Sequence, residues 1–130
     1  IRLAGYGYPR APASPITIDR EAGTLREYPL TTLDFFGLRI PAAGGGYLRQ
    51  FPFAVIRRAF VERERLRAPG VFYVHPWELD PEQPRLPVGA LTRMRHYRGL
   101  ESTAERIDRL LREFAFTSIA GDLAHEALSA

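Results

Sequence analysis

Residues 71–78 read VFYVHPWE, and their apolar and aromatic composition is the main basis for the fold that the sequence predicts. Residues 71–74 are β-branched or aromatic without polar alternation, which is typical of a strand buried on both faces. Strands of that kind belong to parallel sheets whose two faces are covered by helices. We therefore expect residues 71–74 to form an interior strand that ends at His75.

Amphipathic helices are predicted on both sides of this strand. Upstream, apolar residues from Leu48 to Phe60 recur at helical spacing, and Pro52 suits a first helical turn because its missing N–H would be unpaired there. Downstream, residues 102–105 read STAE and match a capping box that opens a second helix. Shorter segments complete the order, with strands expected at 25–31, 34–40 and 115–119 and a terminal helix at 122–128.

Alternating strands and helices predict the fold class. Their order is typical of α/β proteins built from right-handed crossover units on a parallel sheet. Residues 1–23 hold several prolines and glycines without periodicity, so we expect them to be irregular and residues 24–130 to carry the α/β portion, with 76–99 as a long ordered loop. So few strands cannot close a barrel. We therefore expect the chain to be the C-terminal segment of one larger α/β domain.

Composition excludes several classes of protein. The chain has 130 residues, of which 45% are hydrophobic, so it can bury a core, but no stretch approaches the roughly 18 apolar residues of a membrane span. The absence of cysteine excludes disulfides and thiolate metal sites and leaves the redox compartment unreadable, with a cytoplasmic location favoured over a periplasmic one. The net charge is +3 and arginines alternate with glutamates, which favours a solvated surface over nucleic-acid binding.

His75 is the residue that most strongly suggests chemistry. If residues 71–74 form a parallel strand, His75 lies at its carboxyl end, where α/β folds build ligand sites. An imidazole ordinarily titrates near pH 6.5, at about the pH where it can both give and take a proton. The alternative, a histidine that is only hydrogen-bonded at the end of a strand, stays open at this point.

Neighbouring motifs each have a chemical and a plain interpretation. Trp77 could stack on a sugar or cover the core, and Glu78 with Asp80 could form an acid/base pair, although turn formation is favoured in a proline-rich segment. Glycines 44–46 could let a ligand approach the backbone, although a permissive turn is favoured. Residues 93–98, RMRHYR, could bind a phosphate, an anionic glycan or RNA, or form a solvated basic loop.

A family resemblance adds to these interpretations. The segment YVHPWELDPEQPR at residues 73–85 is its most specific part, and the stretches at 44–49, 93–100 and 103–116 support it. From about Leu25 onward the chain resembles the C-terminal portion of NodB-homology polysaccharide deacetylases. It is most similar to the exosortase-associated subgroup of bacterial exopolysaccharide loci, which carries a C-terminal DUF3473-type region.

That resemblance implies a distorted (β/α) barrel and the metal-dependent hydrolysis of N-acetyl groups on a polymeric sugar. It implies that a zinc-type divalent ion activates water and that His75 is the catalytic general acid, which protonates the leaving amine. The metal ligands of the family match nothing in this chain, in which His75, His96 and His125 are separated by 20 or more residues. The chain alone would therefore be inactive, with the metal ligands upstream in the same domain.

The expected partners are an N-acetylated polysaccharide and the upstream part of the domain, and not a nucleic acid or a membrane. The resemblance makes Tyr73 a wall of the pocket that receives the acetyl group, and the remaining residues are chosen for their rim position and polarity. The expected substrate-binding residues are Tyr47, Arg49, Tyr73, Trp77, Arg95 and His96. The alternative from a different class is a non-catalytic glycan-binding or scaffolding module.

Overall fold

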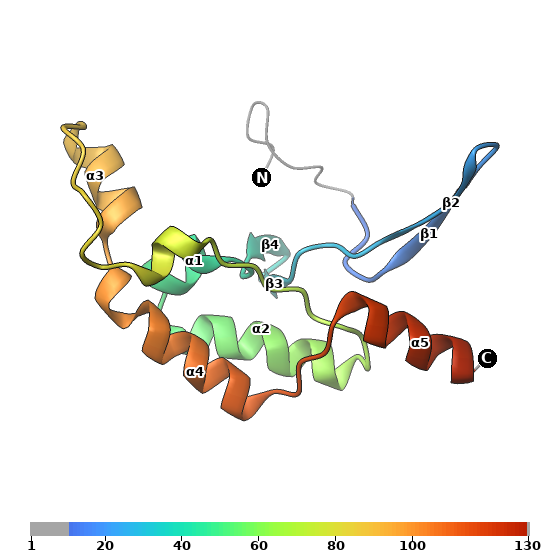
Figure 1. Cartoon of the computed structure of the whole chain (residues 1–130). Helices are drawn as coiled ribbons and strands as arrows, with labels where there is room; N and C mark the ends of the chain where they lie inside the picture. Colours follow the sequence, from blue (N-terminus) through green and yellow to red (C-terminus); the bar gives the residue numbers. More distant parts are fainter. Residues whose placement is uncertain (1–10, 130) are drawn as a thin grey trace.

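Turn-forming residues fold the first part of the chain into two β-hairpins. The computed structural model describes residues 11–129 (Figure 1). Four short strands form two separate antiparallel pairs, β1 (Ile16–Arg20) with β2 (Gly23–Glu27) and β3 (Thr32–Phe35) with β4 (Leu38–Pro41). At the second turn, Phe36 and Gly37 have φ angles of 49° and 76°. Positive φ at both central residues is the requirement of a type I′ turn, which matches the twist of a two-residue hairpin.

Helices make up most of the chain from Gly45 onward. They are α1 (Gly45–Gln50), α2 (Phe53–Arg65), η1 (Pro76–Leu79), α3 (Ala90–Tyr97), η2 (Leu100–Ser102), α4 (Thr103–Glu113) and α5 (Ile119–Ser129), where η marks a 3₁₀ turn. In Figure 1, α4 runs alongside α2, the β1–β2 hairpin extends from one end of this layer, and α3 stands at the other end. None of the helices in this part of the chain is long and apolar enough to cross a membrane.

Pro52 divides the helix that the apolar periodicity predicts into two. Phe51 has extended dihedral angles, φ −90° and ψ 154°, because a residue before proline is sterically disfavoured in the helical region. Pro52 then occupies the N-cap of α2. Arg106 donates to the carbonyl oxygens of Leu48 and Phe51, which pairs backbone groups at the end of α1. The prediction of helical structure is therefore right, but the prediction of one continuous helix from Leu48 to Phe60 is wrong.

The core lies between α2, α4 and the β3–β4 hairpin. Phe60 is its aromatic centre, with ring centroids 5.5 Å from Phe114, 5.8 Å from Phe116 and 6.2 Å from Phe72. The buried apolar side chains of this cluster are Leu33, Ala42, Leu48, Phe53, Ile56, Ala59, Phe60, Leu110 and Phe114. Burying such side chains is the main favourable contribution to folding, so this cluster holds the β3–β4 hairpin, α1, α2 and α4 together.

The interior parallel strand expected at residues 71–74 is wrong. This segment is extended and half-buried, but it joins no sheet. The carbonyl oxygen of Val71 accepts hydrogen bonds from the backbone N–H and the hydroxyl of Thr31, at 3.2 and 2.8 Å. Phe72 packs on Phe60. One apolar side of the segment therefore covers the core, which explains its composition without a neighbouring strand.

The structure also tests the other secondary-structure elements that the sequence predicts. The described residues contain only antiparallel pairs, so the alternating parallel α/β order is wrong for them, and the coarser description is a mixed α/β chain with small antiparallel sheets and helices. Residues 115–119 form no strand, and the loop expected at 76–99 contains η1 and α3. Residues 122–128 are helical, within α5. The irregular segment 1–23 lies partly outside the described residues, and its residues 16–20 form β1.

The capping box expected at residues 102–105 predicts the start of α4 correctly, but the side chain of Ser102 makes no capping hydrogen bond to the helix. The helix begins at Thr103. The hydroxyl of Ser102 instead donates to the carbonyl oxygen of Gly99, at 3.1 Å, and Thr103 donates to the same oxygen at 3.0 Å. These bonds fix the 3₁₀ turn η2 against the start of α4.

Candidate functional site

The segment with the most distinctive sequence, at residues 75–78, is organised by a buried ion pair. Arg49 on α1 and Glu78 on η1 are both 2% exposed in their side chains. Oε1 of Glu78 accepts hydrogen bonds from Nη2 of Arg49 at 3.0 Å and from Nε at 3.2 Å. Two N–H donors of a guanidinium on one carboxylate make a strong, directional contact. The pair therefore fixes η1 relative to α1.

Arg49 also binds the end of α3. Its Nη1 donates to the carbonyl oxygens of His96 at 2.9 Å, Arg98 at 3.0 Å and Arg95 at 3.4 Å. The last carbonyls of a helix have no partner within the helix and carry partial negative charge, so a cation is stabilising there. A single buried guanidinium thus joins α1, η1 and α3.

Two glycines before α1 make room for this arrangement. A Cβ atom on Gly45 would overlap the carboxylate of Glu78. A Cβ atom on Gly44, whose φ is 106°, would lie 2.7 Å from ring atoms of Tyr73. By contrast, a Cβ atom on Gly46 would meet nothing within 4 Å. The positive φ of Gly44 fits the permissive turn that the sequence predicts, and the glycine run also admits protein side chains, which neither sequence interpretation includes.

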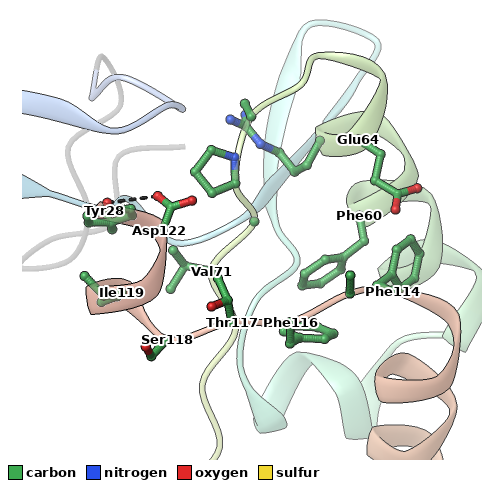
Figure 2. Close-up of a pocket in the computed structure, with 15 residues that line it drawn as sticks. Tyr28, Phe60, Glu64, Val71, Phe114, Phe116, Thr117, Ser118, Ile119 and Asp122 are labelled. Carbon is green, nitrogen blue, oxygen red and sulfur yellow. Dashed lines mark hydrogen bonds between the residues drawn. The ribbon is translucent and has the colours of Figure 1, made fainter. Parts of the chain in front are cut away.

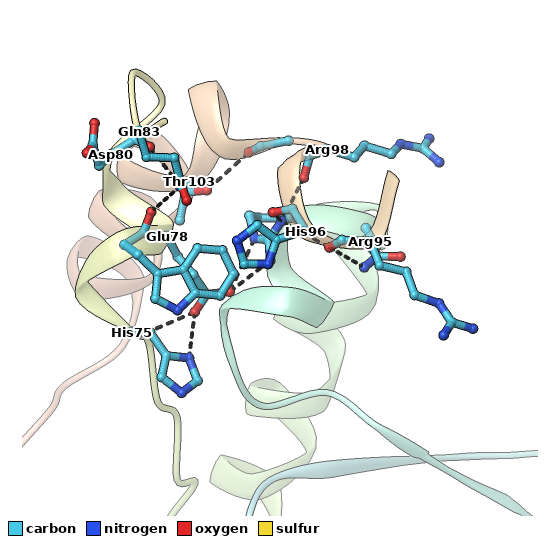
Figure 3. Close-up of polar contacts among 12 residues, drawn as sticks. His75, Glu78, Asp80, Gln83, Arg95, His96, Arg98 and Thr103 are labelled. Atoms are coloured by element: carbon cyan, nitrogen blue, oxygen red, sulfur yellow. Dashed lines mark hydrogen bonds and ion pairs between the residues drawn. The ribbon is translucent and has the colours of Figure 1, made fainter. Parts of the chain in front are cut away.

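His75 is held by the other oxygen of the same carboxylate. Oε2 of Glu78 accepts the backbone N–H of His75 at 2.9 Å and lies 3.2 Å from Nδ1 of its ring (Figure 3). The same carboxylate oxygen therefore contacts both the backbone and the ring of His75. The side chain of His75 is 55% exposed. Glu78 thus fixes the orientation of a ring that remains open to solvent on its Nε2 side.

A row of aromatic rings leads away from His75. Ring centroids lie 5.4 Å apart between Tyr73 and His75, 5.9 Å between His75 and Trp77, and 4.3 Å between Trp77 and His96. The Trp77 and His96 rings are stacked with an interplanar angle of 9°, and His96 meets Tyr97 edge-on at 4.6 Å. The row joins η1 to α3, so the residues proposed from two separate motifs form one surface.

The structure brings most of the expected site residues together, but their contacts differ from the expected roles. Trp77 contacts His75, His96 and the guanidinium of Arg49, whose Cζ lies 5.1 Å from the ring centroid, so the tryptophan is a spacer within the row. Arg49 is buried and its donors are used inside the protein, which leaves it no glycan contact in this conformation. Arg95 is exposed on α3. Tyr47 is half-buried and packs on Phe51, 5.8 Å between centroids.

The sequence points to Glu78, but not to the two side chains that its carboxylate contacts, Arg49 and His75. Asp80, its expected acid/base partner, is exposed and accepts the backbone N–H of Glu82 at 3.1 Å, as in a turn. Glu78 is instead 1% exposed, and its carboxylate binds Arg49 and His75. The signal that could have found it is its spacing: Glu78 follows His75 by three residues, across one turn of a 3₁₀ helix, where positions i and i+3 face each other.

Residues 11–129 hold no cluster of three or more His, Asp or Glu side chains that could bind a metal ion. Both carboxylate oxygens of Glu78 already have protein partners. Oε1 accepts from Arg49, and Oε2 accepts from the backbone N–H of His75 and contacts its ring. The zinc-type ion that the family resemblance implies therefore finds no ligand set in this part of the chain.

A separate pocket lies at the opposite end of α2 (Figure 2), with a volume of about 230 Å³. Its aromatic wall includes Phe60, Phe114 and Phe116. Burial, together with the hydrogen bond that the hydroxyl of Tyr28 donates to Asp122 at 2.9 Å, raises the pKa of Tyr28. Burial lowers the pKa of Arg63, which also lines this pocket. None of the expected site residues lies here.

Comparisons with known proteins give one match. A family model described as a domain of unknown function, DUF3473, matches residues 1–124. No curated protein and no solved structure shows significant similarity to the chain. The matched span includes both the Arg49–Glu78 pair and the aromatic row.

Proposed function

This chain belongs to the DUF3473 family, and from the geometry around His75 we propose that it is the C-terminal part of a polysaccharide deacetylase in which His75 is the catalytic general acid. The single observation that carries the proposal is the contact of Nδ1 of His75 with the buried carboxylate of Glu78 at 3.2 Å. A titratable ring oriented by a buried carboxylate, with its second nitrogen open to solvent, is the arrangement that general acids and bases use.

Glu78 supplies what the acid needs. Its contact with Nδ1 fixes the orientation of the His75 ring, whose side chain is 55% exposed. Arg49 in turn fixes Glu78 through two N–H donors. Glu78 and Arg49 are therefore positioning residues, because neither reaches the surface, and His75 is the group that meets substrate.

The proposed step is the collapse of the tetrahedral intermediate in amide hydrolysis. The C–N bond breaks, the amine nitrogen takes the proton from Nε2 of His75, and acetate leaves while the sugar keeps a free amine. Without this proton the leaving group would be an amide anion, which is a very poor leaving group. We assign no step to a metal ion, because the described residues offer it no ligand set.

A larger domain around this chain is part of the proposal. The β3–β4 hairpin exposes large apolar side chains at its tip, with Phe36 92% exposed, Leu38 53% and Phe35 43%. Adjacent exposed apolar residues are typical of surfaces that other polypeptide covers. This supports a NodB-type (β/α) barrel whose other elements pack on the hairpin.

The test replaces His75 in the intact protein that carries this chain. We expect His75→Gln to lower the rate of acetate release from an N-acetylated polysaccharide by about 100-fold or more, the usual contribution of a general acid. The alkaline limb of the pH–rate profile should disappear with it, because that limb reports deprotonation of the acid.

The matched control is His125→Gln, a histidine exposed on α5, which should leave the rate unchanged. Full activity of His75→Gln would contradict the assignment. Tight binding of the polysaccharide by an intact protein that releases no acetate, with any divalent metal supplied, would favour a glycan-binding module, which a row of half-buried aromatic rings also suits.

A further inference from the structure

A basic groove lies beyond the far end of the aromatic row, between α3 and the loop before it. Its volume is about 800 Å³, and its lining residues are Arg85, Leu86, Pro87, Ala90, Arg93, Met94, Tyr97 and Arg98. The lining contains three arginines and no acidic side chain. Resting on the proposed deacetylase function, we propose that this groove binds the carboxylate groups of an acidic polysaccharide, so that the substrate of the site is an anionic N-acetylated glycan.

Contacts with the backbone hold two of the three arginines in place without neutralising them. Arg85 donates to the carbonyl oxygen of Pro81 at 3.0 Å, and its Cζ lies 4.4 Å from the ring centroid of Tyr97. Arg93 donates to the carbonyl oxygen of Val88 at 3.3 Å. A guanidinium has five N–H donors, so each of these arginines keeps donors for a ligand.

Charge also remains available at the groove. In the described part of the chain, none of the ion pairs within 4.0 Å includes Arg85, Arg93 or Arg98. The planar fork of a guanidinium matches the two oxygens of a carboxylate. Three such forks around one groove favour a ligand that repeats its negative charge.

The loop that forms one wall of the groove is fixed to α3. The backbone N–H of Leu86 donates to the hydroxyl of Tyr97 at 2.9 Å. Met94 on α3 and Pro87 on the loop contribute apolar lining between the arginines. Apolar surface flanked by hydrogen-bonding groups suits a sugar ring, whose faces are apolar and whose edge is polar.

Contacting rings connect the groove to His75, the proposed general acid. Tyr97 lines the groove and meets His96, and His96 stacks on Trp77, which in turn stacks on His75. A polymer that lies along this row would place one residue at His75 and a later residue in the groove. Binding energy from the acidic residue would thereby position the acetylated one, as remote contacts do in many enzymes.

RNA is the other polyanion to consider, and the groove suits it less well. Single-stranded RNA binding relies on open aromatic faces on which successive bases stack. Here Arg85 covers the Tyr97 ring, and His96 meets that ring edge-on. Carboxylates on a sugar chain need only the guanidinium forks and the apolar floor, both of which the groove supplies.

The test measures binding by the intact protein, with no turnover required. The probes are an oligosaccharide that alternates N-acetylglucosamine with glucuronate, a neutral N-acetylglucosamine oligosaccharide of equal length, and oligouridylate. We expect the acidic sugar to bind most tightly. The double variant Arg93→Gln/Arg98→Gln should weaken its binding by about 100-fold, or tenfold for each lost charge-assisted contact, and leave the neutral sugar unaffected.

The matched control is Arg58→Gln/Arg65→Gln, which removes the same charge from exposed positions on α2 and should change the Kd by less than about twofold. Equal affinity for the acidic and neutral sugars, equal loss in both double variants, or preference for oligouridylate would each overturn the proposal. Binding is measured without turnover, so its outcome does not depend on proton donation by His75. Binding of the acidic sugar by an inactive protein would therefore refute the catalytic role and leave the groove assignment standing.

Discussion

Two arginines on neighbouring helices are almost equally buried and have opposite surroundings. Arg49 on α1 is 5% exposed and Arg63 on α2 is 6% exposed. The guanidinium of Arg49 meets the carboxylate of Glu78 and three backbone carbonyl oxygens. That of Arg63 donates to the hydroxyl of Ser14 at 3.0 Å, while its Nε is buried without a hydrogen-bond partner.

Burial alone therefore does not identify a functional charge. Desolvation of a cation is costly in both places, and only complete pairing offsets it. Around Arg49 the pairing is complete, and the same contacts orient His75 and the aromatic row. Around Arg63 the cost is visible in its lowered pKa, which burial causes. The difference predicts that substitutions around the two arginines have very different effects.

The largest effect is expected from Glu78→Leu. This change leaves the guanidinium of Arg49 buried without its carboxylate, and breaking a buried pair on one side typically destabilises a protein by about 3–5 kcal/mol. Backbone N–H groups of α1 and η1 should then exchange hydrogen much faster, since local opening becomes easier. Hydrogen–deuterium exchange of the intact protein, followed by mass spectrometry, reports this for each segment separately.

The double variant Glu78→Leu/Arg49→Leu is the control for this prediction. Removing both charges restores an apolar interior, so much of the lost protection should return, although the carbonyl oxygens at the end of α3 lose a donor. If Glu78→Leu alone left exchange in α1 and η1 unchanged, the pair would not hold these elements together, and the contrast with Arg63 would disappear.

The sequence predicts the elements near this pair better than their arrangement. Helical periodicity identifies α2 and α4, because each buries one apolar face in the core. The run at residues 71–74 misleads, because apolar composition reports burial and does not report a neighbouring strand. The β3–β4 hairpin is missed because its turn uses Phe36, a bulky residue with positive φ, in place of the usual asparagine or aspartate.

The candidate site shows the same limit. His75, Trp77 and His96 can be picked out by residue type, and the structure does place them in one row. Residue type alone does not identify Glu78 as the side chain that orients His75, because a glutamate in a proline-rich segment resembles an ordinary turn residue. Its partner Arg49 lies 29 positions away in the sequence. Pairings over that distance depend on the tertiary fold, which local spacing does not encode.

A smaller effect is expected from Gly45→Ala. The added methyl group would overlap the carboxylate of Glu78, and forcing extra volume into a packed site typically costs about 1–3 kcal/mol. Because Glu78 must shift, catalysis should fall together with stability. Gly46→Ala adds the same methyl group to the next position of α1, where it meets nothing within 4 Å. Thermal unfolding and acetate release should therefore be close to normal for Gly46→Ala, and equal losses in the two variants would show that the approach of Glu78 is not what requires a glycine.

The smallest effect is expected at the other arginine. Arg63→Met keeps the long side chain, removes a desolvated charge and eliminates the unpartnered Nε, at the expense of one hydrogen bond to Ser14. Replacing a poorly compensated buried charge by an apolar side chain is often neutral or stabilising, so the free energy of unfolding should change by less than about 1 kcal/mol or rise. The same substitution at Arg49 should cost several times as much, since Glu78 would then be buried alone. Urea unfolding of the two variants compares them directly. A large loss for Arg63→Met would mean that this guanidinium has an anionic partner in the intact protein, and the two buried arginines would then be alike.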